Sequence, residues 1–442
     1  MNVFLHFNDL RVHDNVGLAR ATADDTTIPV YIEDPRISDN TGRNQEAFKQ
    51  RTLAALQEEY ERRGAELVTK HGEVETVINE LDLDTVYYNH AYDPRVAAVQ
   101  RRLDNTVETE AYHDKLYVKP GLFTSEYDTF SPYYRAWKSN PKIQPVTTTP
   151  NFAEHNISSD ELRDHAYLTE APEAGEVAAK GAWEAFKQNR LRTYKDERDN
   201  VANPRGVSRL SPYYAVGALS PRTVIDEVET LLDQTDDGNP IRNIAKYRSE
   251  LAWREFNYHV LIHNPSVVEE NYKDMEVDWS NDSDEIQAWK EGRTGIPFVD
   301  AGIRQLRNTG YMHNRLRQNV ASFLTKHLLT DWRVGASFFK EYLLDHDTAS
   351  NNGGWQWSAS TGTDSVPVRI FNPEKQGRRY DENAEYIKKW VPELEDVDPQ
   401  TIHKWTDIDH DDRDQAPEYP APIIDFDKRY HGAKKRFNRA LP

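Results

Sequence analysis

The sequence contains no cysteine among its 442 residues. The chain can therefore form no disulfide, offers no thiolate nucleophile and cannot ligate an iron–sulfur cluster through sulfur. No stretch approaches the ~18 uninterrupted apolar residues of a membrane helix, and no basic-then-apolar signal peptide opens the chain. We expect a water-soluble, cytoplasmic protein, and at this length two or three domains with large cores.

Positive charge is also scarce. The 55 Lys and Arg residues are outnumbered by 74 Asp and Glu, which gives a net charge of −19. A nucleic-acid-binding protein normally shows a basic surface, so this balance lowers the expectation of such a partner without excluding it. The acidic residues are spread along the whole chain, which favours a halophilic cytoplasm where salt screens their repulsion. High salt also weakens phosphate contacts, so DNA binding there has to rely on shape and stacking.

Residues 1–125 predict a doubly wound α/β domain with a parallel sheet. A helix is expected over 45–63, where apolar side chains recur near helical spacing and Gly64 follows as a stop. Short strand-like runs surround it at 3–7, 28–32, 65–70 and 85–90.

Beyond this domain the sequence changes character. Residues 126–185 mix Pro, Ser, Thr and acidic residues with little periodicity, and are interpreted as a connector between domains. Residues 186–442 show no strand pattern and are rich in Trp, Tyr, Arg and Leu, which predicts a larger, all-α domain. Its clearest helical windows are 246–263, 297–308 and 314–329.

Two tryptophans stand one residue apart in NNGGWQW at 351–357, a segment that its paired glycines predict to be a loop. The chain also contains the motifs FNDLRVHDN (7–15), GVSRLSPYYAVGALSP (206–221), ELAWREF (250–256) and TGYMHNRLR (309–317). One such motif is a weak signal, but five in one order are specific. From Val3 to Leu441 the chain resembles the DNA photolyase and cryptochrome family, and most nearly the class I photolyases that repair cyclobutane pyrimidine dimers.

The resemblance implies that the helical domain binds FAD in a folded form. Small hydroxyls and N–H groups that open a helix suit a pyrophosphate, although SRLS alone is more typical of an ordinary N-cap. Arg317 and Asp345 match a buried ion pair beside the flavin ring. The matching cofactor positions are Tyr194, Ser208, Arg209, Leu210, Ser211, Arg254, Asn314, Arg317, Asp345, Asp347 and Asn351.

Two acidic segments admit a rival interpretation as metal sites. In 345–347 a histidine stands between two aspartates, but no further His or Cys cluster supports a metal site there. The run DIDHDDRD at 407–414 lacks the glycine of a calcium loop and is typical of a solvated surface. We expect no bound metal.

Asn351 and three tryptophans match positions that serve electron transfer in the family. The Asn351 amide would meet flavin N5 and tune its reduction; plant-type cryptochromes carry aspartate there and animal-type ones cysteine. Trp355, Trp332 and Trp279 match a relay in the order proximal, central and exposed, whereas Trp357 would face the substrate. Any one of these tryptophans could be ordinary core, but this explains the set poorly.

The implied partner is DNA whose damaged pyrimidine pair is flipped out of the helix. Trp253 and Trp357 would stack on the flipped bases. The substrate positions are Glu250, Trp253, Asn314, Gln318, Trp357 and the phosphate-binding Arg198, Arg315 and Arg369. Gln318 replaces a usual methionine and Val368 an aromatic pair; both are expected at the substrate cavity, where they affect lesion affinity and leave the flavin untouched.

The sequence therefore predicts a monomeric, light-driven lyase that splits cyclobutane pyrimidine dimers by lending them an electron from excited reduced FAD. The N-terminal domain would hold an antenna chromophore, either 8-hydroxy-5-deazaflavin or methenyltetrahydrofolate, or be empty. The main alternative is a cryptochrome-type blue-light photoreceptor, which Gln318 and Val368 favour and which Asn351 and the short C-terminal tail oppose. A 6-4 photoproduct photolyase and a flavin-free structural protein are weaker alternatives.

Overall fold

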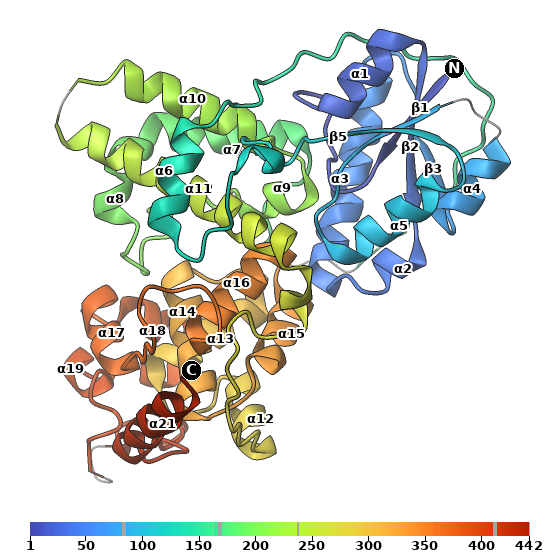
Figure 1. The fold of residues 1–442 in the computed structure, drawn as a ribbon. Helices are drawn as coiled ribbons and strands as arrows, with labels where there is room; N and C mark the ends of the chain where they lie inside the picture. The colour runs from blue at the N-terminus through green and yellow to red at the C-terminus, as the bar shows by residue number, and fades with distance from the viewer. Residues whose placement is uncertain (82–84, 164, 166–169, 237, 410–412, 442) are drawn as a thin grey trace. The chain divides into compact units, whose positions relative to one another are not determined.

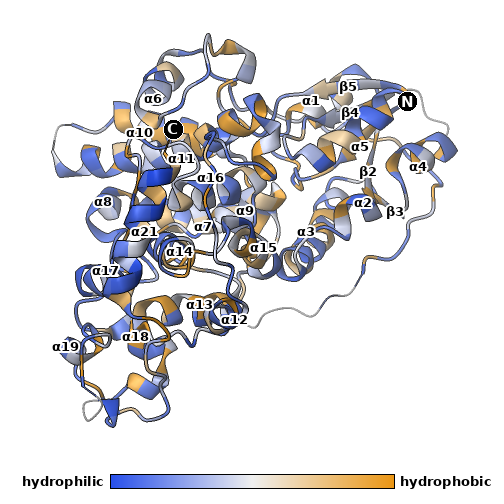
Figure 2. Cartoon of the chain, turned by 60° about the horizontal axis from the view of Figure 1, so that its bottom comes forward, coloured by the Kyte–Doolittle hydropathy of each residue, from blue (hydrophilic) through white to orange (hydrophobic). Residues whose placement is uncertain are grey.

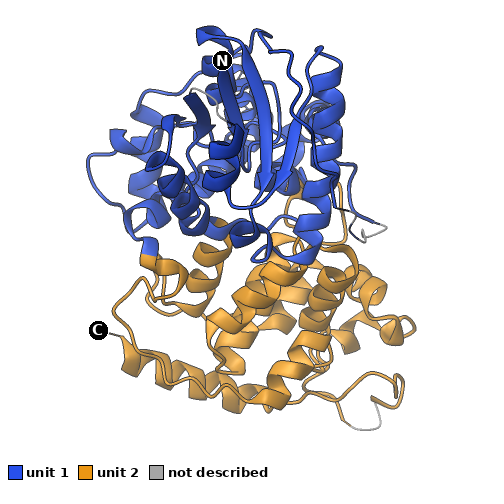
Figure 3. Ribbon diagram, turned by 90° about the vertical axis from the view of Figure 1, so that its right-hand side faces the viewer, with its two compact units in different colours: residues 1–194, 208–265, 344–349 blue, residues 195–207, 266–343, 350–442 orange. Residues whose placement is uncertain are grey.

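The computed structural model describes the whole chain except residues 82–84, 164, 166–169, 237, 410–412 and 442. The chain forms two compact units, coloured blue and orange in Figure 3. Unit 1 comprises Met1–Tyr194, Ser208–Pro265 and Leu344–Ala349, and unit 2 comprises Lys195–Val207, Ser266–Leu343 and Ser350–Pro442. Part of the acidic run predicted to be a solvated surface at 407–414 lies outside the described residues.

The strands are β1 (Asn2–His6), β2 (Thr27–Glu33), β3 (Val68–His71), β4 (Thr85–Asn89) and β5 (Glu108–Tyr112). The helices up to residue 268 are α1 (Val16–Asp24), α2 (Pro35–Ser38), α3 (Arg43–Glu61), α4 (Val74–Leu81), α5 (Pro94–Asp104), η1 (Pro120–Leu122), α6 (Phe130–Ser139), α7 (Glu176–Asn189), η2 (Leu191–Thr193), α8 (Tyr194–Glu197), α9 (Ser211–Val216), α10 (Pro221–Asp233), α11 (Asn239–His263) and η3 (Pro265–Val268). The later helices are α12 (Ser283–Glu291), α13 (Pro297–Thr309), α14 (Asn314–Ser322), η4 (Phe323–His327), α15 (Trp332–Tyr342), α16 (Thr348–Ala359), α17 (Pro373–Tyr380), α18 (Glu385–Trp390), η5 (Pro392–Leu394), α19 (Pro399–Ile402) and α21 (Phe426–Ala440).

The sheet of unit 1 has the strand order β3-β2-β1-β4-β5, and every neighbouring pair is parallel (Figure 1). Val3 of β1 lies in register between Ile28 of β2 and Val86 of β4. All three side chains are fully buried, as expected where a parallel sheet is covered on both faces. The predicted doubly wound α/β domain is confirmed.

The sequence did not predict the edge strand β5. Its residues ETEAY are mostly polar, and none of them is fully buried. An edge strand pairs on one side only and tolerates such a composition, so it gives no strong apolar signal.

The helical character of the later part of the chain is confirmed as well. The windows predicted at 246–263, 297–308 and 314–329 fall on α11, α13 and α14. The third window ends early, because α14 stops at Ser322 and the π-helical turn η4 follows. Trp289, Trp332 and Trp355 lie in the large hydrophobic core of unit 2.

The prediction of a loop at 351–357 is wrong, because these residues lie inside helix α16. The amides of Asn352 and Gln356, one helical turn apart, both donate to the carbonyl of Val267, the latter at 2.8 Å. Gln356 also donates to Asn352 at 3.2 Å. These hydrogen bonds offset the low helix propensity of the glycine pair, and a Cβ at Gly354 would meet open space.

The segment interpreted as a connector, 126–185, is more structured than its composition suggests. It contains α6 and the start of α7. Between these helices it runs along the sheet. The backbone N–H of Ala153 donates to the carbonyl of Thr27 at 3.1 Å, and that of Asp160 donates to the carbonyl of Thr69 at 2.8 Å. The compact units do not coincide with the predicted domain limits, which stay a prediction.

Helix α11 is fixed within unit 1 by one buried carboxylate. Glu255 accepts the backbone N–H groups of Tyr117 at 2.6 Å and Val118 at 3.3 Å, and the indole N–H of Trp137 at 2.8 Å. The side chain is only 2% exposed, and burial raises the pKa of its carboxyl group. Glu255 therefore ties α11 both to α6 and to the segment that follows β5.

Helix α21 packs against the rest of unit 2 through Ala433 and Phe437. The remainder of this helix is mostly hydrophilic, as Figure 2 shows. None of the helices in the described ranges has the length and apolar character needed to cross a membrane.

We expect Glu255→Gln to destabilise the protein. Glutamine keeps one acceptor oxygen but turns an NH₂ group toward three buried donors, so at least one N–H loses its partner. Urea unfolding followed by circular dichroism should show a loss of roughly 1–3 kcal/mol. The control Glu126→Gln removes an exposed carboxylate and should change little; equal effects of both substitutions would contradict the anchoring role.

Candidate functional site

Helix α11 carries three predicted site residues in unit 1: Glu250, Trp253 and Arg254. Glu250 pairs with the ammonium of Lys246 one turn earlier, at 2.6 Å. Trp253 is half-buried beside it.

The guanidinium of Arg254 is buried next to the rings of Tyr258 and Tyr214. Its central carbon lies 4.9 and 5.7 Å from the centres of these two rings. Its Nη1 donates to the carbonyl of Lys115 at 3.3 Å. Its Nη2 is buried and finds no hydrogen-bond partner among the described residues. A buried cationic donor without an acceptor is costly, so this group fits an anionic ligand such as a phosphate.

The predicted phosphate-binding segment leads into α9, which begins at Ser211. Arg209 adopts a left-handed backbone conformation with φ of 52°, and Leu210 next to it is fully buried. Tyr194 lies edge-on to Tyr247 with ring centroids 5.0 Å apart. The buried tyrosines, Ser208, Ser211 and the N-terminus of α9 thus all belong to unit 1. They lie in segments that were predicted to bind the cofactor.

The residues Asp345 and Asp347 also belong to unit 1, and both are largely buried. The hydroxyl of Tyr258 donates to Asp347, and the ammonium of Lys115 lies 3.9 Å from the same carboxylate. Burial lowers the pKa of Lys115. In the described ranges no three His, Asp or Glu side chains are grouped to hold a metal ion.

In unit 2, helix α14 presents Asn314, Arg315, Arg317 and Gln318 along one short stretch. The helix is capped by His313, a residue that the sequence analysis missed. The Nδ1 atom of His313 accepts the backbone N–H of Arg315 at 3.1 Å, and its Nε2 lies 2.9 Å from the carbonyl of Arg198. This arrangement requires the neutral ring with its proton on Nε2.

The arginines of this region are held by neighbouring groups. Arg315 binds Asp199 through two hydrogen bonds of 2.9 Å and donates to Gln318 at 3.3 Å. Arg198 lies 3.4 Å from the same aspartate. Arg317 donates to the carbonyl of Met312 at 2.8 Å. The predicted pairing of Arg317 with Asp345 stays a prediction, because these residues belong to different units.

Asn351 has one satisfied and one unsatisfied end. Its Nδ2 donates to the carbonyl of Ala336 at 3.1 Å, which fixes the side chain on α16. Its Oδ1 is buried without a hydrogen-bond partner among the described residues. An orphaned buried acceptor calls for a ligand N–H, and a protonated flavin N5 has one. This residue therefore fits the expected cofactor.

The three predicted relay tryptophans all lie in unit 2. Trp355 and Trp332 are 2% and 1% exposed, whereas Trp279 is half-buried. Their order in a relay stays a prediction. Trp332 donates to Asn271 at 2.9 Å, while the indole N–H of Trp355 has no partner among the described residues.

Two rings lie edge-on to Trp355: Phe339 at 4.9 Å and Trp289 at 6.1 Å between centroids. The contact with Trp289 could not be predicted, because Trp289 lies far from Trp355 along the chain. Gly335 makes room for the Trp355 ring, since a Cβ there would come within 2.0 Å of it.

Trp357 also lies on α16, next to Arg369. The guanidinium of Arg369 sits 5.0 Å from the centre of the Trp357 ring and pairs with Asp364 at 3.1 Å. Val368 packs against the hydrophobic cluster around Ala433 and Phe437. Val368 is half-buried in this packing, and its expected place at the substrate cavity stays a prediction.

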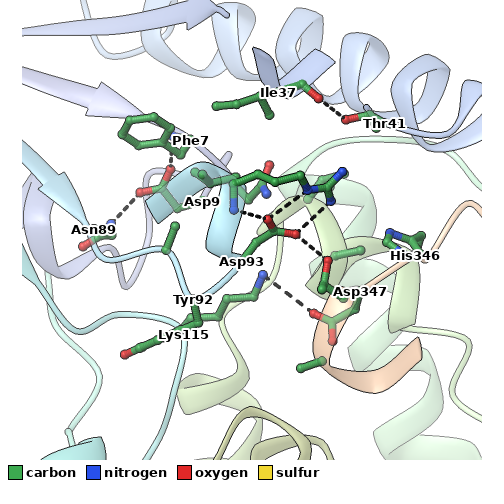
Figure 4. Close-up of a pocket in the computed structure, with 18 of the residues that line it drawn as sticks. Phe7, Asp9, Ile37, Thr41, Asn89, Tyr92, Asp93, Lys115, His346 and Asp347 are labelled. Carbon is green, nitrogen blue, oxygen red and sulfur yellow. Dashed lines mark hydrogen bonds and ion pairs between the residues drawn. The ribbon is translucent and has the colours of Figure 1, made fainter. Parts of the chain in front are cut away.

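A pocket in unit 1 opens at the carboxyl ends of the strands, where Asp9 follows β1, Asn89 ends β4 and Lys115 follows β5 (Figure 4). Strand order reverses between β1 and β4, and such a switch point is the usual ligand site of an open α/β sheet. Asp93 lines the pocket and is held by Arg95 and Thr348.

The cap formed by His313 makes a pH-dependent prediction. Burial lowers the pKa of His313 to about 4, from an ordinary value of 6.5. Between these values the unfolded chain takes up a proton that the folded chain refuses, so the free energy of unfolding should fall as the pH drops from 6.5 toward 4. The shift corresponds to a loss on the order of 3 kcal/mol.

The measurement is urea unfolding at several pH values for the wild type and for His313→Asn, which keeps a capping oxygen but does not titrate. The difference in stability between the two proteins should narrow as the pH falls. A difference that is constant from pH 7 to 4.5 would show that His313 is not the titrating group.

Comparison with known proteins covers the full chain. Residues 2–151 match the family model described as DNA photolyase, and residues 247–439 match the FAD binding domain of DNA photolyase. A deoxyribodipyrimidine photo-lyase of Halobacterium salinarum is 38% identical, and the similarity covers 100% of this chain and 99% of that protein.

Two solved structures extend the comparison. A class III photolyase from Agrobacterium tumefaciens is 33% identical with a TM-score of 0.90, covering 99% of this chain and 97% of that one. A cryptochrome from Synechocystis is 26% identical with a TM-score of 0.90, covering 99% of both chains. The fold, the motifs and the full-length similarity agree, and the chain belongs to the DNA photolyase family.

Proposed function

We propose that this protein is a light-driven deoxyribodipyrimidine photo-lyase that repairs cyclobutane pyrimidine dimers in DNA. The observation that carries the proposal is similarity over the whole chain to a relative with that name. The unsatisfied buried groups of Asn351 and Arg254 support it, because a flavin and a phosphate supply the partners that these groups lack.

Reduced FAD, when bound and excited by light, supplies the electron that opens the dimer. Arg254 and the hydroxyls of Ser208 and Ser211 would hold its phosphates, and the Oδ1 of Asn351 would hold its N5–H. Arg317 would place positive charge near the ring. None of these side chains has to move a proton during the reaction, which agrees with the lack of a general acid–base pair on them.

The substrate side is built from flat aromatic surfaces. Trp253 and Trp357 would each stack on a flipped pyrimidine, an interaction worth roughly 1–3 kcal/mol per base. Glu250, held by Lys246, would accept the N3–H of a pyrimidine. Arg315 and Arg369 would bind flanking phosphates, and Arg198 a third.

The pocket at the switch point of the sheet is proposed to hold the antenna chromophore. A planar, partly polar molecule such as 8-hydroxy-5-deazaflavin or methenyltetrahydrofolate suits its mixture of carboxylates, amides and buried Lys115. Release of bound pigment by denaturation, followed by absorbance and mass spectrometry, identifies it. We also propose that the protein works as a monomer in a salt-rich cytoplasm.

The alternative function is blue-light signalling. The similarity to a Synechocystis cryptochrome and the unusual Gln318 favour it. The two functions share the flavin and differ in whether a bound dimer is split. Illumination of the reduced, FAD-loaded protein with a dimer-containing oligonucleotide separates them, because only a photo-lyase restores the thymines.

We expect photoreduction of the FAD-loaded protein to depend on Trp355. Trp355→Phe should abolish it, because phenylalanine is far harder to oxidise than indole, and Trp279→Phe should shorten the life of the charge-separated state. Chemically reduced protein should still repair DNA in both variants. Transient absorption measures the first effects and recovered thymine the last.

Trp289→Phe is the matched control, because Trp289 touches Trp355 but lies outside the predicted relay. It should leave photoreduction intact. Full photoreduction in Trp355→Phe, or its loss in Trp289→Phe, would show that electrons take another route.

We expect the aromatic walls to govern lesion binding. Trp253→Ala or Trp357→Ala should weaken dimer binding by roughly 1–3 kcal/mol with flavin absorbance little changed. Gln318→Met should leave repair equal or better, because a flexible thioether packs well against bases. If the wild type at high salt splits no dimers in light and Gln318→Met does not rescue it, the photoreceptor function replaces the enzyme.

A further inference from the structure

The indole of Trp253 does not stand alone in unit 1. The ring of Phe130, the first residue of α6, stacks on it face to face with centroids 3.8 Å apart and planes 8° from parallel. Tyr134 stacks on Phe130 in turn, at 5.2 Å and 13°, and Trp137 follows Tyr134 at 5.9 Å and 27°. These four rings form a continuous column, defined here as the α6 column.

The deep end of this column is firmly held. Trp137 is fully buried and donates its indole N–H to Glu255. The Tyr134 hydroxyl accepts from Arg248 at 3.0 Å, and Arg248 is itself paired with Glu229 at 2.8 Å. The column is therefore fixed at its inner end, whereas Phe130 and Trp253 at its outer end are only half-buried.

Two contacts define the orientation of Trp253. Phe130 covers one face of the indole, and Phe256 packs edge-on to it at 5.6 Å and 79°. Phe256 also packs edge-on to Phe130 at 6.0 Å. One face of the indole is thus occupied within the protein itself, and a flipped base can stack only on the other.

We propose that Phe130 is a positioning residue for the substrate: it holds the plane of Trp253 and selects the face that receives the pyrimidine dimer. The inference rests on the proposed repair function. An indole turns about two side-chain bonds, and ordering it during binding weakens affinity. Stacking on Phe130 orders the ring before DNA arrives, in the way that rigid aromatic anchors strengthen other binding surfaces.

The test measures dark binding of a dimer-containing oligonucleotide and repair under light at saturating DNA. Phe130→Ala should weaken binding roughly three- to tenfold, the range expected when one side chain loses its preorganisation. Repair per bound complex and FAD content should be unchanged. Phe130→Tyr restores a flat ring and should bind as the wild type does.

A double-mutant cycle shows whether the effect passes through Trp253. In the Trp253→Ala background, Phe130→Ala should cause no further loss, because there is no indole left to position. The inference is overturned if Phe130→Ala and Phe130→Leu both bind like the wild type. It is also overturned if Phe130→Ala weakens binding by the same factor with and without Trp253, which would mean that Phe130 acts on DNA directly or through the fold.

Failure of the proposed function has a different signature. A wild-type protein that binds dimer-containing and undamaged oligonucleotides equally would refute the repair function, and this inference with it. Selective binding by the wild type combined with an ineffective Phe130→Ala would refute only the positioning role. Thermal unfolding of Phe130→Leu controls for damage to α6.

Discussion

The site in unit 1 depends on how helix α11 is turned about its own axis, and a buried carboxylate sets that turn. Glu255 accepts hydrogen bonds from two backbone N–H groups and one indole N–H at once. It can do so in only one orientation of the helix about its axis. Because residues one and two positions earlier are Arg254 and Trp253, the same orientation of the helix places the guanidinium proposed to bind the cofactor and the ring proposed to bind the substrate. A buried charge that satisfies several donors is costly to misplace, so the arrangement is well defined.

The carboxylate of Glu255 also supports Trp253 indirectly, through helix α6. Through Trp137 it holds α6, and through the stacked rings of α6 it supports Trp253 from behind. The indole is therefore fixed both by its own helix and by a neighbouring one. If Trp253 stacks on a dimer as proposed, this support is an advantage, since a stacking surface discriminates poorly when its plane is free to tilt.

The sequence predicted most of the scaffold but not the groups that hold the proposed site residues in place. Buried strands such as β1 were predicted from their apolar runs, whereas the polar edge strand β5 has no such run and was not predicted. The glycines at 353–354 predicted a loop, because the hydrogen bonds that support a helix there run from Asn352 and Gln356 to Val267 of η3, which is far away in sequence. Phe130 and His313 escaped notice for the same reason: stacking and capping partners become visible only when the chain has folded.

The charge of the chain bears on how it would hold DNA. The proposed phosphate-binding arginines are already engaged, Arg315 with Asp199 and Arg369 with Asp364. Binding a phosphate then exchanges one anionic partner for another, so the net electrostatic gain is small, and salt reduces it further. Stacking of bases on Trp253 and Trp357 is not an interaction between charges, so salt does not screen it. For an acidic protein of this kind, well-ordered aromatic surfaces would therefore matter more than phosphate contacts, and the α6 column supplies that order for Trp253.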